Sequence, residues 1–166
     1  MVEDETGIDG GPERRAALTA RVQAETGIDR AMIHRLVHGF YDRVRRDPLL
    51  GPVFDARIGD WSFHLDRMCT FWESVALMTG SYHGQPMVKH APLPVDAVHF
   101  DRWLDLFRQA AVDICPPPAA EHFIIRAQRI AASLELGMAT HAGVMLRPGE
   151  RFHRPAPSAV GQGTGQ

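Results

Sequence analysis

Cysteine is scarce in this sequence of 166 residues, because only Cys69 and Cys115 occur and neither belongs to a CxxC or CxxCH motif. This scarcity excludes a disulfide framework, a paired-cysteine metal site and a covalently attached haem. Long apolar runs are also missing: no stretch approaches the roughly 20 residues of a membrane span, and residues 1–30 contain no secretory signal. The net charge of -2 gives no basic excess for nucleic acid. We therefore expect a cytoplasmic protein without nucleic-acid or membrane partners.

Helical periodicity dominates the middle of the chain. The segments expected to be helical have apolar residues at i, i+3, i+4 and i+7, and cover about residues 30–47, 61–80, 96–115 and 119–140. Asp29 and Asp60 are placed to cap the first two helices. No segment alternates with period 2, so the sequence predicts an all-α protein. We expect a flexible leader over residues 1–27, a folded domain over 28–144 and a disordered proline- and glycine-rich tail over 145–166.

His90 has an unusual setting. It ends the short run PMVKH, which is enclosed by Gly84 and Pro86 on one side and by Pro92 and Pro94 on the other. A haem iron commonly takes one imidazole as its proximal ligand. That imidazole must be held rigidly through its other ring nitrogen. The clamped platform therefore makes His90 a candidate iron ligand.

Three further polar residues lie in apolar helical stripes and could face a ligand on such an iron: Tyr41, His64 and Trp103. On spacing alone, Tyr41 and Trp103 can instead be core residues whose hydroxyl and indole N–H have hydrogen-bond partners within the protein, and His64 can be structural. His34 and His38 have the i, i+4 spacing of zinc ligands but no third ligand nearby in sequence. A haem-free helical bundle with a histidine metal site is thus an open alternative.

Four segments carry a resemblance that bears on these alternatives. They are FYDRVRRDPLLGPVF at 40–54, HLDRMCTFW at 64–72, YHGQPMVKH at 82–90 and HFDRWLDLF at 99–107. In this order they resemble the group III truncated haemoglobins, small bacterial globins with a two-over-two helical sandwich around haem. The resemblance covers about residues 28–144.

The resemblance implies a role for each matching position. His90 is then the iron ligand of a non-covalent haem b, while Tyr41 and Trp103 donate hydrogen bonds to the bound gas. His64 and Met68 complete the ligand pocket. The residues implied to contact the haem itself are Phe54, Met68, Phe71, Trp72, Met87 and Phe107. The implied propionate partners are Arg57, Tyr82 and Lys89.

The expected function is binding of O2, NO or CO at a penta-coordinate ferrous iron in a monomer. Hydrogen bonds to charged groups contribute roughly 1.5–3 kcal/mol each, about one to two decades in a dissociation rate. Two distal donors therefore predict slow oxygen release, which suits ligand capture better than transport. The alternative is a redox enzyme, such as a nitric oxide dioxygenase or a peroxidase. It would need an external reductase, because the chain contains no flavin motif.

Overall fold

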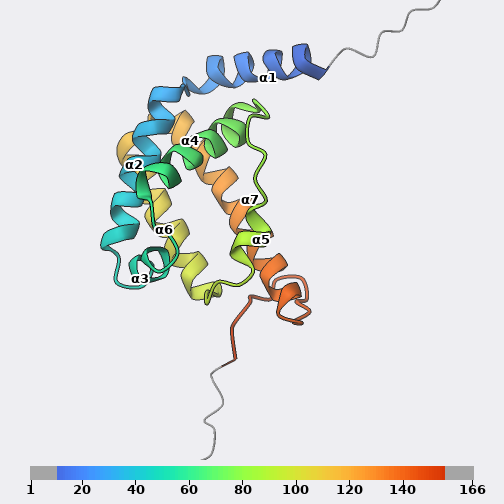
Figure 1. The fold of residues 1–166 in the computed structure, drawn as a ribbon. Coiled ribbons are helices and arrows are strands. Elements are labelled where there is room, and N and C mark those ends of the chain that lie inside the picture. The colour runs from blue at the N-terminus through green and yellow to red at the C-terminus, as the bar shows by residue number, and fades with distance from the viewer. Residues whose placement is uncertain (1–10, 156–166) are drawn as a thin grey trace, which may run out of the picture.

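Seven helices form the part of the chain that the computed structural model describes, residues 11–155 (Figure 1). In chain order they are α1 (Gly11–Thr26), α2 (Arg30–Arg46), α3 (Gly51–Asp55), α4 (Trp61–Leu77), α5 (Pro86–His90), α6 (Ala97–Ile114) and α7 (Pro117–His141). No strand occurs in this range, which confirms the all-α prediction. None of these helices has the length and apolar character that crossing a bilayer requires.

Two helix pairs, α2 with α4 and α6 with α7, pack on each other through an aromatic centre. The Trp72 ring of α4 stacks on Phe107 of α6, with centroids 4.9 Å apart and planes 21° apart. Phe40 of α2 meets Phe107 edge-on at 5.2 Å, and Phe123 of α7 meets Trp72 edge-on at 5.9 Å. Such contacts stabilise a core beyond the burial of their area. This arrangement agrees with the two-over-two sandwich.

Aspartate caps fix where three of these helices begin. The Asp29 carboxylate accepts from the Met32 amide at 2.8 Å, and the Asp60 carboxylate accepts from the Phe63 amide at 3.0 Å. Asp96 caps α6 in the same way, within a capping box. The helix predicted to run to Gly80 instead ends at Leu77, because the next residue takes a left-handed φ of 59°.

The last turn of α4 is held by side chains of two other helices. Thr19 of α1 donates to the carbonyl oxygen of Leu77. His122 and Arg126 of α7 each donate, at 3.0 Å, to one of the two preceding carbonyl oxygens. These are groups that a helix end leaves without partners. The C-terminal end of α4 is therefore fixed from two directions.

Helix α1 departs from the predicted flexible leader. Residues 11–26 form four helical turns, although none of their side chains is fully buried. Val22 packs against the edge of the core, and Thr19 makes the contact with α4. Residues 1–10 of the predicted leader lie outside the described residues.

The chain after α7 also departs from expectation, because part of the predicted disordered tail is packed. Phe152 is fully buried in a second apolar cluster with Val95, Phe100 and Met138. We call residues 151–154 the C-terminal strap. It returns from the end of α7 to the beginning of α6, where the Ala97 amide donates to the Phe152 carbonyl oxygen at 2.7 Å. Residues 156–166 lie outside the described range.

Candidate functional site

Helix α5 holds His90 in the way that the sequence predicts. Pro86 occupies the first turn, where its missing amide hydrogen costs nothing. The His90 Nδ1 lies 2.6 Å from the Pro86 carbonyl oxygen. Because a carbonyl can only accept, Nδ1 carries the proton and Nε2 is left as the unprotonated nitrogen. This is the tautomer that a metal ligand needs.

A glycine of α7 allows α5 to approach closely. A Cβ atom on Gly137 would lie 2.1 Å from the Met87 Cε and 2.5 Å from its Sδ. The Met87 side chain therefore fills the space that a larger residue at position 137 would occupy. Met87 was predicted to contact haem, and the structure shows this further role in seating α5 on α7.

Across from α5, the first turns of α4 meet α2 at a group of rings. The Tyr41 and His64 rings lie edge to face, 5.2 Å apart at 90°. Phe54 of α3 and Trp61 of α4 flank Tyr41 at 5.9 Å and 6.0 Å. The guanidinium of Arg45 lies 4.5 Å above the Trp61 ring, a cation–π contact. The cap at Asp60 sets the start of α4, so it also sets where His64 projects.

The electrostatic setting of His64 connects it to α5. The pKa of this imidazole is lowered, first by burial and then by the positive charges of Arg67, of His90 when it is protonated, and of Lys89. Side chains of α5 therefore contribute to the electrostatic setting of His64 on α4. The His64 Nε2 is buried and has no hydrogen-bond partner within residues 11–155. A buried nitrogen without a partner is costly and calls for an explanation.

Tyr41 and Trp103 occupy different environments near Phe40. Tyr41 is only 5% exposed, and burial alone raises the pKa of its phenol well above the usual range. The hydroxyl thus stays protonated and able to donate. Trp103 is half-buried; its ring meets Phe40 edge-on at 5.4 Å and stacks on Phe107 at 5.4 Å. Phe40 is thus in contact with both predicted donors.

The remaining predicted haem contacts fall into two groups. Phe54, Met68 and Phe71 are half-buried at the edge of the core, where a ligand can reach them. Trp72 and Phe107 are buried at 3% and 1% exposure and stack on each other within the core. Their main contacts are thus with protein.

Of the three residues predicted to pair with the haem propionates, Tyr82 lies beside α4, whereas Lys89 and Arg57 are exposed. Tyr82 meets Phe71 edge-on at 5.2 Å, and its amide donates to the Ser74 hydroxyl at 3.4 Å. Lys89 is exposed on α5, and Arg57 is exposed in the turn that follows α3. Of the three, Tyr82 thus contacts α4, and Lys89 is the neighbour of His90 on α5.

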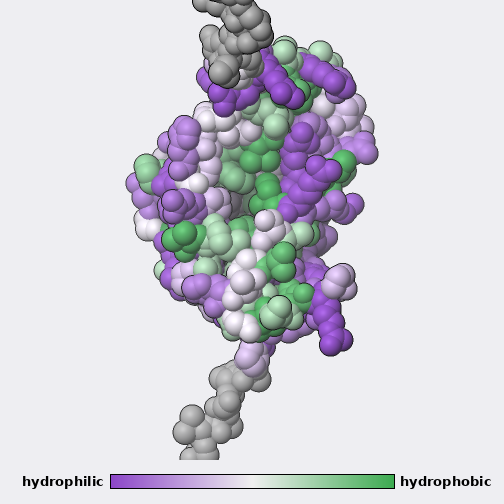
Figure 2. Space-filling model, turned by 90° about the vertical axis from the view of Figure 1, so that its right-hand side faces the viewer, coloured by the Kyte–Doolittle hydropathy of each residue, from purple (hydrophilic) through white to green (hydrophobic). Residues whose placement is uncertain are grey.

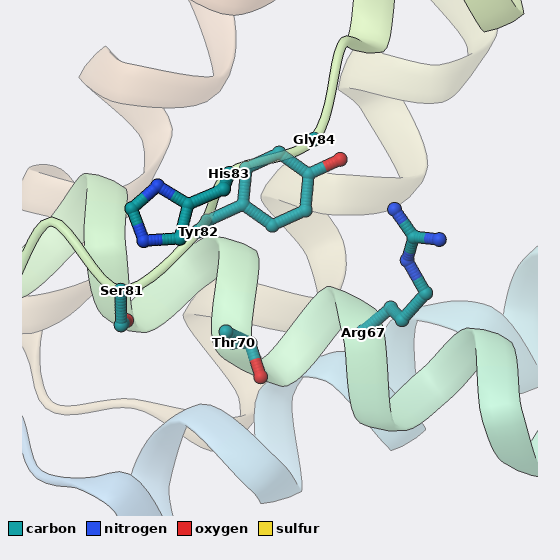
Figure 3. Close-up of a pocket in the computed structure, with 6 residues that line it drawn as sticks. All are labelled: Arg67, Thr70, Ser81, Tyr82, His83 and Gly84. Carbon is teal, nitrogen blue, oxygen red and sulfur yellow. The ribbon is translucent and has the colours of Figure 1, made fainter.

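Sequence reasoning missed Arg67, which lies one helical turn after His64. With Tyr82 and Gly84 it lines a pocket of about 280 Å³ between α4 and the segment leading to α5; Thr70, Ser81 and His83 complete the lining. In Figure 3 the Arg67 guanidinium and the Tyr82 hydroxyl both point toward Gly84. The signal was available, because residues three apart share a helix face.

The surface on the α5 side is suited to an apolar ligand. Figure 2 views the side of the molecule on which α5 lies in Figure 1, and shows an apolar surface, hollowed near its centre, between polar areas. Contiguous apolar surface of this kind marks ligand grooves and other binding sites. His34 and His38 do not compete as a metal site: their rings stack at 4.0 Å, and residues 11–155 contain no group of three His, Cys, Asp or Glu side chains that could hold a metal ion.

Comparison with known proteins decides the family. Residues 25–134 match the family model described as bacterial-like globin. The chain belongs to the bacterial-like globin family. The group 3 truncated hemoglobin ctb of Campylobacter jejuni is 34% identical to this globin over 113 residues, which cover 65% of this chain and 89% of that protein. The group 2 truncated hemoglobin YjbI of Bacillus subtilis is 28% identical over 85 residues, which cover 50% of this chain and 64% of that protein.

A solved structure agrees with this assignment. The crystal structure of the group III truncated hemoglobin from Campylobacter jejuni matches this globin with a TM-score of 0.61 at 34% identity, covering 64% of this chain and 88% of that one. The resemblance to group III is thereby confirmed. This globin is accordingly a haem protein that binds small ligands.

The residues present fit a haem. His90 offers an uncommitted Nε2 on a braced platform, and His64 offers a buried Nε2 without a partner within the described range. Half-buried apolar side chains line the edge of the core, and the Arg67 cation stands at the adjoining pocket, where a carboxylate of the cofactor can pair with it.

Proposed function

We propose that this globin binds haem b non-covalently between α4 and α5, with His90 as its one protein ligand to the iron. O2, NO or CO then occupies a pocket formed by Tyr41, His64, Met68 and Trp103. The observations that support this proposal most strongly are the states of two imidazoles, His90 on α5 and His64 on α4. One is locked through Nδ1 to the Pro86 carbonyl oxygen, and the other presents a buried, unpartnered Nε2.

The haem supplies a ferrous iron with one open position for a diatomic ligand. The protein supplies hydrogen-bond donors around that position. The Tyr41 phenol donates, because burial raises its pKa and keeps it protonated. The Trp103 indole N–H can only donate. Donation to a partly charged ligand atom contributes roughly 1.5–3 kcal/mol per bond, so we propose slow oxygen release.

The cationic side chains near the pocket hold the two haem propionates. Arg67 is the best supported, because it lines the pocket with Tyr82 and also acts on the pKa of His64. Lys89 also lowers this pKa. Arg–carboxylate pairs are shorter and stronger than neutral hydrogen bonds. Arg57 has no comparable contact to support it.

Replacement of His90 tests the proposal. His90→Ala should abolish haem retention or loosen it severely, and added imidazole should restore binding by filling the vacated space. The absorption spectrum of the ferrous protein is the measurement, and His141→Ala, at the exposed end of α7, is the matched histidine control. A normal five-coordinate ferrous spectrum in His90→Ala would overturn the assignment.

The ring pair of Tyr41 and His64, at the N-terminal end of α4, supports a second function. Tyr41 and His64 lie 5.2 Å apart, and burial shifts the pKa of each in favour of its uncharged form. One neutral donor beside one neutral base is suited to moving a proton during redox chemistry. We propose nitric oxide dioxygenation or peroxide turnover as this alternative, with electrons from an external reductase. Stopped-flow mixing of the oxygen-loaded protein with nitric oxide tests it: stoichiometric nitrate would support the enzyme, and simple ligand exchange would refute it.

A further inference from the structure

The C-terminal strap is anchored by a buried carboxylate. Glu135 of α7 is only 7% exposed, and its two oxygens accept from the Arg151 Nε at 2.9 Å and Nη2 at 3.0 Å. The Phe152 amide donates to the same carboxylate at 2.9 Å, and Arg151 also reaches Asp101 of α6 at 2.8 Å. A bidentate pair with a further donor provides the partners that a buried charge requires. The strap is therefore fixed to both α6 and α7.

From this anchor the strap reaches the turn that follows His90. Arg154 Nε donates to the Val95 carbonyl oxygen at 3.0 Å, and Arg154 Nη2 donates to the Leu93 carbonyl oxygen. The Arg154 amide also donates to the Asp96 carboxylate at 3.1 Å. One residue of the strap thus holds three groups of residues 93–96.

This turn is directly continuous with the candidate iron ligand. The Leu93 amide donates to the His90 carbonyl oxygen at 2.9 Å, so the residue that Arg154 holds on one side is bonded to His90 on the other. Helix α5 has only five residues, too few to be stable alone. It packs on α7 and is joined to α4 by residues 78–85, which form neither helix nor strand. Its position therefore depends on what holds its ends.

We infer that the C-terminal strap, through Arg154, is a positioning element for His90: it holds the turn after α5 and thereby the imidazole on the iron side. The inference rests on the proposed role of His90. The strap lies beyond residue 134, where the match to the bacterial-like globin model ends. Its hydrogen bonds to residues 93–97 go to backbone groups and to the Asp96 carboxylate, and no strap residue needs to touch the cofactor.

Arg154→Ala in the full-length protein is the test, with Arg147→Ala as the matched control. Both arginines are exposed on the same segment, but only Arg154 contacts residues 93–96 through its side chain. Circular dichroism should show equal helix content in both variants. In haem-free protein, Arg154→Ala should speed amide exchange at residues 91–97 by about ten-fold or more, because two hydrogen bonds from a charged donor are lost. The control should match the parent.

The haem-loaded protein provides the decisive measurements. Arg154→Ala should shift the iron–histidine stretching band in the resonance Raman spectrum of the ferrous form and speed haem release about ten-fold. An unchanged band and release rate, with His90 proven as ligand in the parent, would refute the positioning role and leave the proposed function intact. If the parent binds no haem through His90, the proposed function fails instead. The exchange data then still show whether the strap holds the turn.

Discussion

Gly137→Ala places one methyl group at the contact between α5 and α7. The added carbon would overlap the end of the Met87 side chain, with the Cε atom 2.1 Å away and the Sδ atom 2.5 Å away. Only the flexible end of the methionine must move, because its Cγ is already at 3.5 Å. The perturbation therefore acts on the seat of α5 and leaves the rest of α7 intact.

Two opposing effects set the size of the change. Alanine in place of glycine inside a helix stabilises that helix by roughly 0.8–1 kcal/mol. Displacing Met87 from a filled space costs roughly 1–3 kcal/mol. We expect the free energy of unfolding to change by less than about 2 kcal/mol. The cost falls on α5, so haem release should accelerate by about ten-fold, the equivalent of ~1.4 kcal/mol.

Transfer of haem to a strong haem-binding acceptor measures the release, and thermal unfolding of haem-free and haem-bound protein measures the stability. The double variant Met87→Ala, Gly137→Ala is the control, because the shortened side chain leaves room for the new methyl group. We expect release from the double variant to be no faster than from Met87→Ala alone. If Gly137→Ala raises the melting temperature and leaves haem release unchanged, Met87 does not seat α5 as described.

Three further predictions concern other parts of the molecule. Tyr41→Phe and Trp103→Phe should each speed oxygen release by about ten-fold or more, since each removes one hydrogen-bond donor. His64→Leu should change the rate of carbon monoxide association more than the rate of oxygen release. The reverse pattern in flash photolysis and stopped-flow data would contradict these roles. Removal of haem should lower the melting temperature and the helical signal, because a ligand that binds only the folded state stabilises it; equal melting of both forms would argue against the site. Asp47→Asn should lower the free energy of unfolding by roughly 1.5–3 kcal/mol near neutral pH. Burial opposes the charge of Asp47, but the amides of Leu49 and Leu50 and the Arg102 guanidinium outweigh it and lower the pKa of this carboxyl below 3.8. Its contribution should thus be complete above that pH and disappear as the pH falls through the lowered pKa, so urea titrations of parent and variant should converge in acid.

Local signals in the sequence account for the parts of the fold that were predicted well. Asp29 and Asp60 each precede an apolar periodic segment, and a cap acts within one helical turn, so the start of both helices could be predicted from sequence. The same holds for His90, whose Nδ1 bond goes to Pro86, four residues away. Interactions of this range are encoded in neighbouring residues.

The missed features depend on residues far apart in the chain. The sequence of helix α1 lacks the apolar stripe that predicts a helix, and none of its residues is fully buried. Its contact with Leu77 joins positions that are 58 residues apart. Phe152 stands in a segment with the composition of a tail, and the groups that hold it, Glu135 and the apolar cluster around Phe100, are distant in sequence. Gly137 looks like an ordinary mid-helix glycine until Met87 is placed against it. Composition and periodicity contain no information about such pairs.

Helix α4 is anchored to other helices by hydrogen bonds at its C-terminal end. Its C-terminal end is clamped by Thr19, His122 and Arg126, whereas the hydrogen bonds at its first turn come from its own cap at Asp60. Because each residue advances a helix by about 1.5 Å, His64 lies roughly 20 Å from the clamp. A small tilt at the C-terminal end therefore produces its largest displacement at the N-terminal end, where Trp61 and His64 contact a ring and a guanidinium of α2. Any such motion of α4 therefore displaces the His64 imidazole more than it displaces Leu77.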